Sequence, residues 1–224
     1  MTLLHALGML LIVATVLLTL AALAGAAATA ASRRPRVAGR LLAGLAGWYA
    51  LLIGFVGAVS LAQPGRSLGP GRVKRFCGFY LDCHLGAAVV GRQRLESIGD
   101  ATPRGMFEVV TVEISSDARQ ETLRPYGIQA TLVDANGRRY ERDPRGEAGW
   151  ERLSGRSVSF DQEVAARGGA LQKDVVFDVS RDASGLSLDV RERGFPDDVL
   201  EWFLAGDEDS FLHRRAMLRL PSGK

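Results

Sequence analysis

The chain has 224 residues, 47% of them hydrophobic, and a net charge of +3. All 25 acidic side chains lie at or after Asp82, so the positive excess belongs to the part of the chain before Asp82. Beyond Asp82, basic side chains alternate with acidic ones and form no basic stripe, which argues against nucleic acid as a partner. The apolar N-terminal part excludes a free cytosolic enzyme.

Two apolar stretches within residues 1–62 predict a transmembrane helical hairpin. The first spans residues 3–31 and the second residues 41–62, and neither contains a charged side chain apart from His5 if it is protonated. Each exceeds the roughly 20 residues that cross a bilayer, and in lipid only a helix satisfies its own backbone groups. A cleaved signal peptide is the alternative for the first stretch, but its start has no Lys or Arg and its apolar run is too long. The lipid bilayer is therefore the first expected partner.

Small residues recur at every fourth position of the second span. A helix would place these residues on one smooth face, where a neighbouring helix can approach closely. The first span has Ala22, Ala26 and Ala30 at the same spacing, so the two spans are expected to pack as an antiparallel pair. The alternative is that an alanine-rich composition produces such stripes by chance. The predicted packing residues are Ala46, Ala50, Gly54 and Ala58.

The arginines between the two spans predict the orientation. The loop 32–40 carries four arginines, and residues 66–75 carry four basic side chains, so the two flanks balance. The short loop cannot carry a folded domain across the membrane, whereas long C-terminal domains are translocated largely regardless of charge. We therefore expect a two-span membrane protein with its C-terminal domain outside the cytoplasm.

Cys77 and Cys83 are close enough in sequence to close a small loop. Outside the cytoplasm such a pair would oxidise, so a disulfide is expected. Two free buried thiols are one alternative, and a zinc site with His84 and His213 is another. The zinc site is disfavoured because adjacent residues of a strand, such as Cys83 and His84, point to opposite faces.

The region 63–72 is expected to be a linker, because it is rich in Gly and Pro and has no apolar periodicity. Residues 73–224 then suit one domain. Apolar residues alternate with polar ones in this domain, with Met106, Val110, Val112 and Ile114 on one face and Glu108 as the exception. Val175, Phe177 and Val179 are likewise expected to point inward. Strands are predicted at 106–115, 128–133, 138–140, 157–164, 172–179, 185–190 and 216–220, with less certain ones at 85–95 and 200–204.

Asn136-Gly137 between two such strands predicts a hairpin with a type I′ turn, which requires positive φ at both residues. Residues 195–206 could be a helix instead of a strand, with Pro196 near the start and Gly206 at the end. Many short strands joined by turns are typical of an all-β protein, here an antiparallel β-sandwich.

Four sequence runs resemble a known family. They are CGFYLDCHLGAAV, FEVVTVEISSDAR, ATLVDANGRRYER and GDEDSFLHRRAMLRL. The resemblance is to bacterial membrane-anchored, extracytoplasmic immunoglobulin-like domains of unknown function, and it covers residues 73–220. It implies an immunoglobulin-like β-sandwich and no catalytic residues. Because the chain has no lipobox cysteine near its start, the helical hairpin is the expected anchor.

The sequence offers few candidates for chemistry. Asp207, Glu208 and Asp209 could bind calcium, although a solvated turn also explains them. No nucleophile elbow, zinc-protease motif or phosphate-binding glycine loop is present, so we expect no catalytic residues and no cofactor. Trp150, Trp202 and Phe203 could form an exposed aromatic patch or pack in the core.

The expected function is that of a non-enzymatic module that binds an envelope protein or an envelope polymer through loops or a sheet edge. An accessory subunit that packs against a larger membrane complex through its helices is the alternative. An envelope hydrolase is a further one, which would require a cleft beside His84 or His213.

Overall fold

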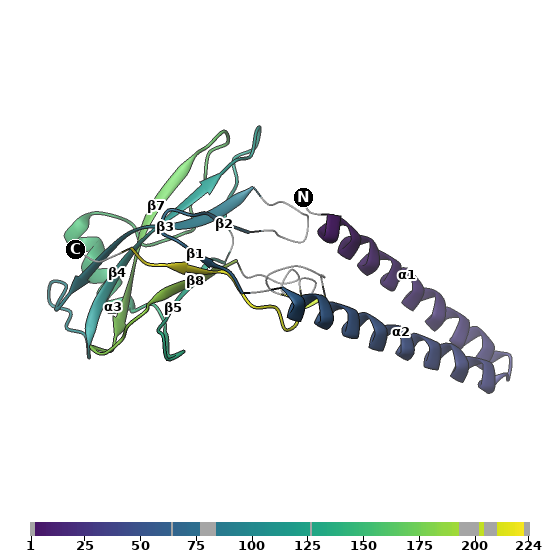
Figure 1. Ribbon diagram of the computed structural model, residues 1–224. Helices are drawn as coiled ribbons and strands as arrows, with labels where there is room; N and C mark the ends of the chain where they lie inside the picture. Colours follow the sequence, from purple (N-terminus) through teal and green to yellow (C-terminus); the bar gives the residue numbers. More distant parts are fainter. Residues whose placement is uncertain are drawn as a thin grey trace. The chain divides into compact units, whose positions relative to one another are not determined.

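The computed structural model describes residues 3–63, 65–76, 84–125, 127–192, 202–203 and 210–221. The chain divides into two compact units (Figure 1). One unit consists of Met1–Pro64 and Asp198–Arg214, and the other of Gly65–Asp197 and Arg215–Lys224. We call them the helical unit and the sandwich unit and describe each separately.

Two long helices make up most of the helical unit. Helix α1 comprises Leu3–Ala31 and helix α2 comprises Pro35–Ala62, and both are long and apolar enough to span a membrane. Helix α2 begins before the apolar span expected at 41–62, because proline suits the first turn of a helix, where its missing N–H is not needed. The tight connection between the helices contains Arg33 at φ 57°.

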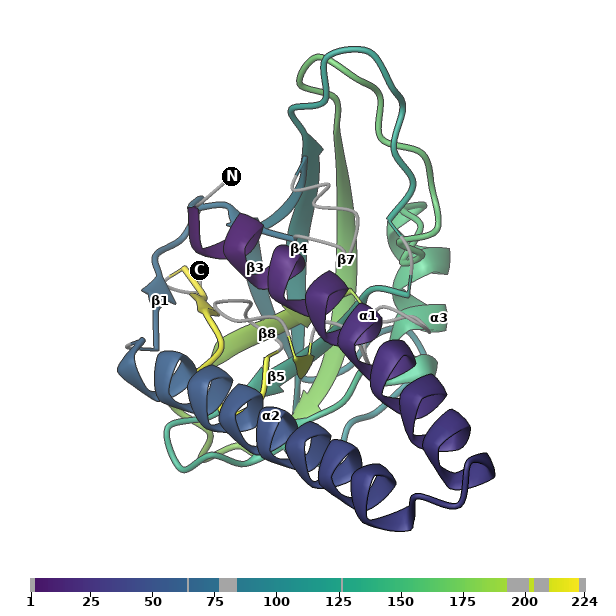
Figure 2. The ribbon, with the colours of Figure 1, turned by 90° about the vertical axis from the view of Figure 1, so that its right-hand side faces the viewer.

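The helices pack as the expected antiparallel pair, side by side in two views (Figures 1 and 2). Polar side chains join them in the middle of the apolar stretches. Trp48 Nε1 donates to Thr15 Oγ1 at 3.1 Å, and the hydroxyls of Thr19 and Tyr49 lie 2.9 Å apart. The polar groups of all four side chains therefore have partners within the helix pair.

The sandwich unit contains two sheets made of nine described strands. One sheet has the order β2-β3-β4-β7 and the other β1-β9-β8-β5-β6. Neighbouring strands are antiparallel, except that β1 and β9 are parallel. The strands are β1 Ser67–Leu68, β2 Lys74–Arg75, β3 Leu85–Leu95, β4 Met106–Ser116, β5 Gln129–Val133, β6 Arg139–Tyr140, β7 Ala170–Val179, β8 Ser187–Arg191 and β9 Met217–Arg219.

A shared apolar core joins the two sheets and confirms the predicted inward faces. Val110, Val112 and Ile114 of β4, with Met106 at their margin, lie in it, as do Val175, Phe177 and Val179 of β7. The second sheet contributes Leu132, Leu188, Val190 and Leu218, each with no exposed surface. The coarse prediction of a mostly β domain after two apolar helices is therefore confirmed.

Part of the outer face of the β2-β3-β4-β7 sheet is also covered. Helix α3, Pro144–Ser154, lies beside β7 (Figure 2). Trp150 of this helix packs against a cluster formed by Ile98, Phe107, Val109 and Val176. Its start and end follow the usual sequence signals, since the Asp143 carboxylate accepts from the Gly146 N–H at 2.7 Å and Gly155 ends the helix at φ 67°. This helix was not predicted from the sequence.

The predicted strand 157–164 is wrong. Only Val164 makes a β-bridge there, with Leu123. Serine side chains hold the local backbone instead: Ser157 Oγ accepts from the Ser159 N–H, and Ser159 Oγ accepts from the Asp161 N–H. Such local bonds compete with a sheet ladder. Phe160 and Val164 reach the core as single side chains.

The hairpin between β5 and β6 is confirmed, but its turn type differs from the prediction. The Gly137 N–H donates to the Asp134 carbonyl at 2.9 Å, and the Asp134 N–H donates to the Arg138 carbonyl at 3.0 Å. Gly137 has φ 79°, whereas Asn136 is not among the residues with positive φ. The turn is therefore a type I turn followed by a glycine bulge, in which one residue with positive φ suffices.

Candidate functional site

Several predicted site residues lie outside the described part of the chain. They are Cys77, Cys83, Asp207, Glu208 and Asp209. The disulfide and the calcium site therefore stay predictions. Among the residues that the structure describes, no three His, Cys, Asp or Glu side chains are grouped to hold a metal ion.

The two candidate histidines lie in different units. His84 Nδ1 is 2.7 Å from Asp117 Oδ1 on the surface of the sandwich unit. This hydrogen bond lowers the pKa of the Asp117 carboxyl below its ordinary value. His213 Nε2 is 2.9 Å from Gln63 Oε1 in the helical unit.

The predicted packing stripe of α2 is exposed in the helical unit. Ala46, Ala50, Gly54 and Ala58 all lie on the surface, and a Cβ at Gly54 would meet nothing within 4 Å. The contacts of α2 with α1 use the face of Trp48, Tyr49 and Leu52 instead. In α1 Ala26 is buried and Ala22 half-buried, whereas Ala30 is exposed. The role of the exposed stripe stays a prediction.

The aromatic residues divide between the two units. Trp150 belongs to the sandwich unit, where it packs against the cluster of Ile98, Phe107, Val109 and Val176. Its Nε1 donates to Asp174 Oδ2 at 2.9 Å. Trp202 belongs to the helical unit and stacks edge to face on Phe203 and Phe211.

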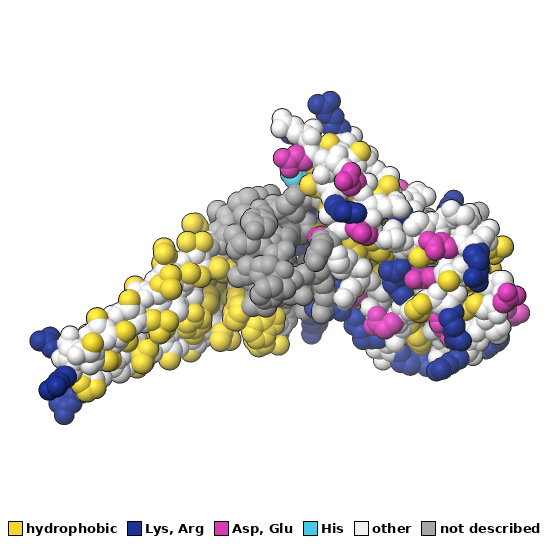
Figure 3. Space-filling model, turned by 180° about the vertical axis from the view of Figure 1, so that it is seen from behind, with side chains coloured by type: hydrophobic (Ala, Val, Ile, Leu, Met, Phe, Trp, Pro, Cys, Tyr) yellow, Lys and Arg dark blue, Asp and Glu magenta, His cyan; other side chains and the backbone are white. Residues whose placement is uncertain are grey.

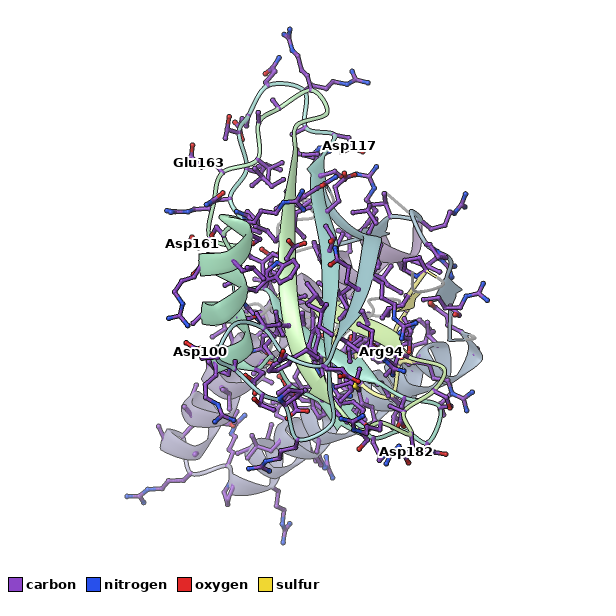
Figure 4. The ribbon with its side chains drawn as sticks, turned by 90° about the vertical axis from the view of Figure 1, so that its left-hand side faces the viewer. Arg94, Asp100, Asp117, Asp161, Glu163 and Asp182 are labelled. Carbon is purple, nitrogen blue, oxygen red and sulfur yellow. The ribbon has the colours of Figure 1, made fainter. Side chains whose placement is uncertain are left out.

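One end of the sandwich concentrates charged side chains. The antiparallel register brings the β3–β4, β5–β6 and β7–β8 connections to this end, and Figure 4 shows Arg94 and Asp182 there. A cleft of about 470 Å³ opens among the β3–β4 and β7–β8 connections, Tyr140 of β6 and the start of α3. We call it the arginine cleft; its lining is Arg104, Gly105, Tyr140, Asp143, Arg145, Asp178, Ser180, Arg181 and Asp182.

A charged triad lies between the sheets near the same end. Glu108 has a fully buried side chain, and Arg92 binds it with two hydrogen bonds of 2.8 Å. Arg94 Nε donates to Glu108 Oε1 at 2.6 Å. The hydrogen bond with Glu108 raises the pKa of Arg92. The triad explains why Glu108 interrupts an otherwise apolar inward face.

A bulge in β3 directs both arginines toward Glu108. The register with β4 shifts between Val89 and Gly91, so the extra residue Val90 reverses which side chains face inward. Before the bulge Leu85, Ala87 and Val89 face the core, and after it Arg92 and Arg94 do. Only glycine fits at position 91, because a Cβ there would lie 2.9 Å from Thr111 Oγ1.

A second buried carboxylate organises the β5–β6 turn. Asp134 accepts hydrogen bonds from the backbone N–H groups of Asn136 and Arg138, from Arg138 Nε and from the Tyr140 hydroxyl. Burial raises the pKa of Asp134, but these hydrogen bonds together lower it by more, so the net pKa is below the ordinary value. The turn therefore depends on an ionised Asp134.

Asp134→Asn should destabilise the sandwich in a pH-dependent manner. Because the folded pKa is lowered, the contribution of the carboxylate is present above the unfolded value of about 4 and is lost as the pH falls through the folded pKa. The wild type should have the higher urea midpoint at neutral pH, and the difference should close in acid. Urea titrations over a pH series check this, and a difference that is equal at every pH contradicts it.

Neither the triad nor the cleft was predicted from the sequence. Glu108 on an inward face was the available signal for the triad, and Gly91 inside a strand was a signal for the bulge. The cleft had no comparable signal, because its lining comes from connections far apart in the sequence.

No protein-family model matches the chain, and no curated protein matches it. Three solved structures are similar. A conserved hypothetical protein from Bacillus anthracis is 19% identical, with 53% of this chain and 92% of that chain covered and a TM-score of 0.37. The yjhA protein from Bacillus subtilis is 13% identical, with 54% and 78% covered and a TM-score of 0.37. The secreted protein MPT63 from Mycobacterium tuberculosis is 13% identical, with 59% and 100% covered and a TM-score of 0.42. At such scores these similarities carry no argument about function.

Proposed function

We propose that the chain is a membrane-anchored binding module. Helices α1 and α2 cross the membrane, and the sandwich unit is an immunoglobulin-like domain outside the cytoplasm that binds an envelope protein or polymer without catalysing a reaction. The arginine cleft is the proposed contact surface, because it combines a concave shape with polar side chains from several connections.

The main support for this proposal is the distribution of exposed apolar side chains. In the helical unit they follow both helices along their length (Figure 3). Only 11% and 17% of the residues in the most apolar windows of α1 and α2 are buried, unlike the core helix of a water-soluble protein. In the described part of the sandwich unit, the exposed large apolar side chains are Val73, Val90 and Leu153. This contrast supports lipid around the helices and water around the sandwich.

The orientation is proposed from the charges. The arginines at the connection of the two helices favour the cytoplasm for that end, which sends both termini to the other side. The expected disulfide of Cys77 and Cys83 and the family resemblance support the same side. The accessory-subunit alternative is supported by the exposed stripe of Ala46, Ala50, Gly54 and Ala58.

Reporter fusions test the proposal in intact cells. A phosphatase that folds only outside the cytoplasm should be active when fused after Lys224. The matched control is the same reporter fused after Arg34, directly before α2, which should be inactive because only α1 precedes it. Activity of a cytoplasm-dependent reporter after Lys224 would overturn the proposed orientation.

A further inference from the structure

The carboxylates of the arginine cleft are already engaged in holding its shape. Asp143 caps α3 through the Gly146 N–H. Asp178 accepts from the backbone N–H groups of Arg104 and Gly105 at 2.8 and 3.0 Å. Asp182 accepts from Arg138 at 3.1 Å. Each of these carboxylates therefore already has at least one partner within the protein.

The three arginines of the cleft differ from its carboxylates in their hydrogen bonding. Within the described residues, the guanidinium groups of Arg104, Arg145 and Arg181 make no hydrogen bond or ion pair, and all three side chains belong to exposed residues. Three arginines and three aspartates line the cleft, so its formal charges balance. Its preference for one kind of ligand therefore comes from hydrogen bonding. The three side chains without a partner are planar donors, because a guanidinium has five N–H donors and no acceptor.

The position of Arg145 is not explained by helix stability. It lies in the first turn of α3, where a cation opposes the helix dipole. Arg152 lies in the last turn of the same helix, where a cation is favourable. Both side chains are exposed, so removing Arg145 should not weaken the fold.

We infer that the arginine cleft binds a ligand through phosphate groups. Arg104 and Arg181 lie in the β3–β4 and β7–β8 connections, and Arg145 lies in the first turn of α3. Their three guanidinium groups offer many donors to one site, and phosphate oxygens accept paired N–H bonds from arginine. The Ser180 and Tyr140 side chains add polar lining. The inference rests on the proposed function in taking the ligand from outside the cytoplasm.

Calorimetric titration of the full chain in phosphatidylcholine nanodiscs tests the inference. Inorganic polyphosphate is the first probe and a water-soluble short-chain phosphatidylglycerol the second, so a free phosphate chain and a lipid headgroup are distinguished. We expect polyphosphate to bind and Arg145→Ala to weaken it about tenfold, equivalent to about 1.4 kcal/mol. The matched control Arg152→Ala should bind as the wild type does.

Two results would overturn the inference. One is an equal loss of affinity in Arg145→Ala and Arg152→Ala, which would mean general attraction to a basic surface. The other is that neither probe binds the wild type, or that the variant Arg104→Ala/Arg145→Ala/Arg181→Ala binds both probes as tightly as the wild type does. Binding of the phosphatidylglycerol alone would support a headgroup as the phosphate source. The reporter fusions fail or succeed independently of these titrations, so the two proposals can fall separately.

Discussion

Replacing Glu108 by alanine should cost the sandwich about 3 kcal/mol of unfolding free energy. The substitution leaves the guanidinium groups of Arg92 and Arg94 between the sheets without their counter-charge. Their side chains are 20% and 35% exposed, so solvent offsets part of the penalty, and we expect the low end of the range for broken buried pairs. The measurement is urea unfolding of the full chain in detergent, followed by Trp150 fluorescence with Trp48 and Trp202 replaced by Phe.

Glu113→Ala is the matched control on the same strand. Its carboxylate lies on the outer face of the sheet, with a 3.1 Å hydrogen bond from Gln172, so its removal should change stability by at most about 0.5 kcal/mol. Replacing Arg92, Glu108 and Arg94 together by Leu should recover most of the loss, because an apolar trio leaves no unpaired charge. A loss below about 1 kcal/mol in Glu108→Ala would show that the triad is solvated.

Phe107→Ala should destabilise the sandwich by about 3–5 kcal/mol. Phe107 is 1% exposed and packs with Ile98, Val109 and Val176 beneath α3. Gly146 of α3 lies so close that a Cβ there would be 2.9 Å from the Phe107 ring, so α3 rests directly on this side chain. The truncation should leave a cavity under the helix, and amide hydrogen exchange of α3 should accelerate with the loss of stability.

The control for this cavity is Leu153→Ala in the same helix. Leu153 is 67% exposed, so its truncation should change the unfolding free energy by less than about 0.5 kcal/mol. If Phe107→Ala destabilises the protein without faster exchange in α3, the helix is held by other contacts, such as the Trp150 to Asp174 hydrogen bond.

Strand faces could be predicted from the sequence where one face alone meets the core. The alternation of Val110, Val112 and Ile114 is visible because the outward positions of that half of β4 are polar. At Phe107 and Val109 both faces are buried, so alternation is lost there and gives no sign of the covering helix.

Helix α3 escaped prediction because its packing contradicts its local propensity. Gly146 and Gly149 weaken the helical pattern, since glycine is unfavourable in a helix interior. The structure requires them for close approach: a Cβ at Gly149 would lie 3.0 Å from the Ile98 carbonyl. The end signals at Asp143 and Gly155 were present, but tertiary contacts decided the outcome.

The candidate site was less predictable than the fold. The inward acid Glu108 could be seen, but its partners depend on a bulge that changes the parity of β3 by one residue. The arginine cleft depends on the β3–β4 connection, the β7–β8 connection and the start of α3 meeting at one end of the sandwich, and no local pattern encodes such a meeting.

The hydrogen bonds between Thr15 and Trp48 and between Thr19 and Tyr49 have a mechanical consequence. In the proposed membrane-spanning arrangement no water can replace either bond, so sliding or rotating one helix against the other would leave polar groups without partners. The two helices would thus keep a fixed register and move through the bilayer as a single body. A pull on the sandwich unit would then be borne by both spans together, not by the second one alone.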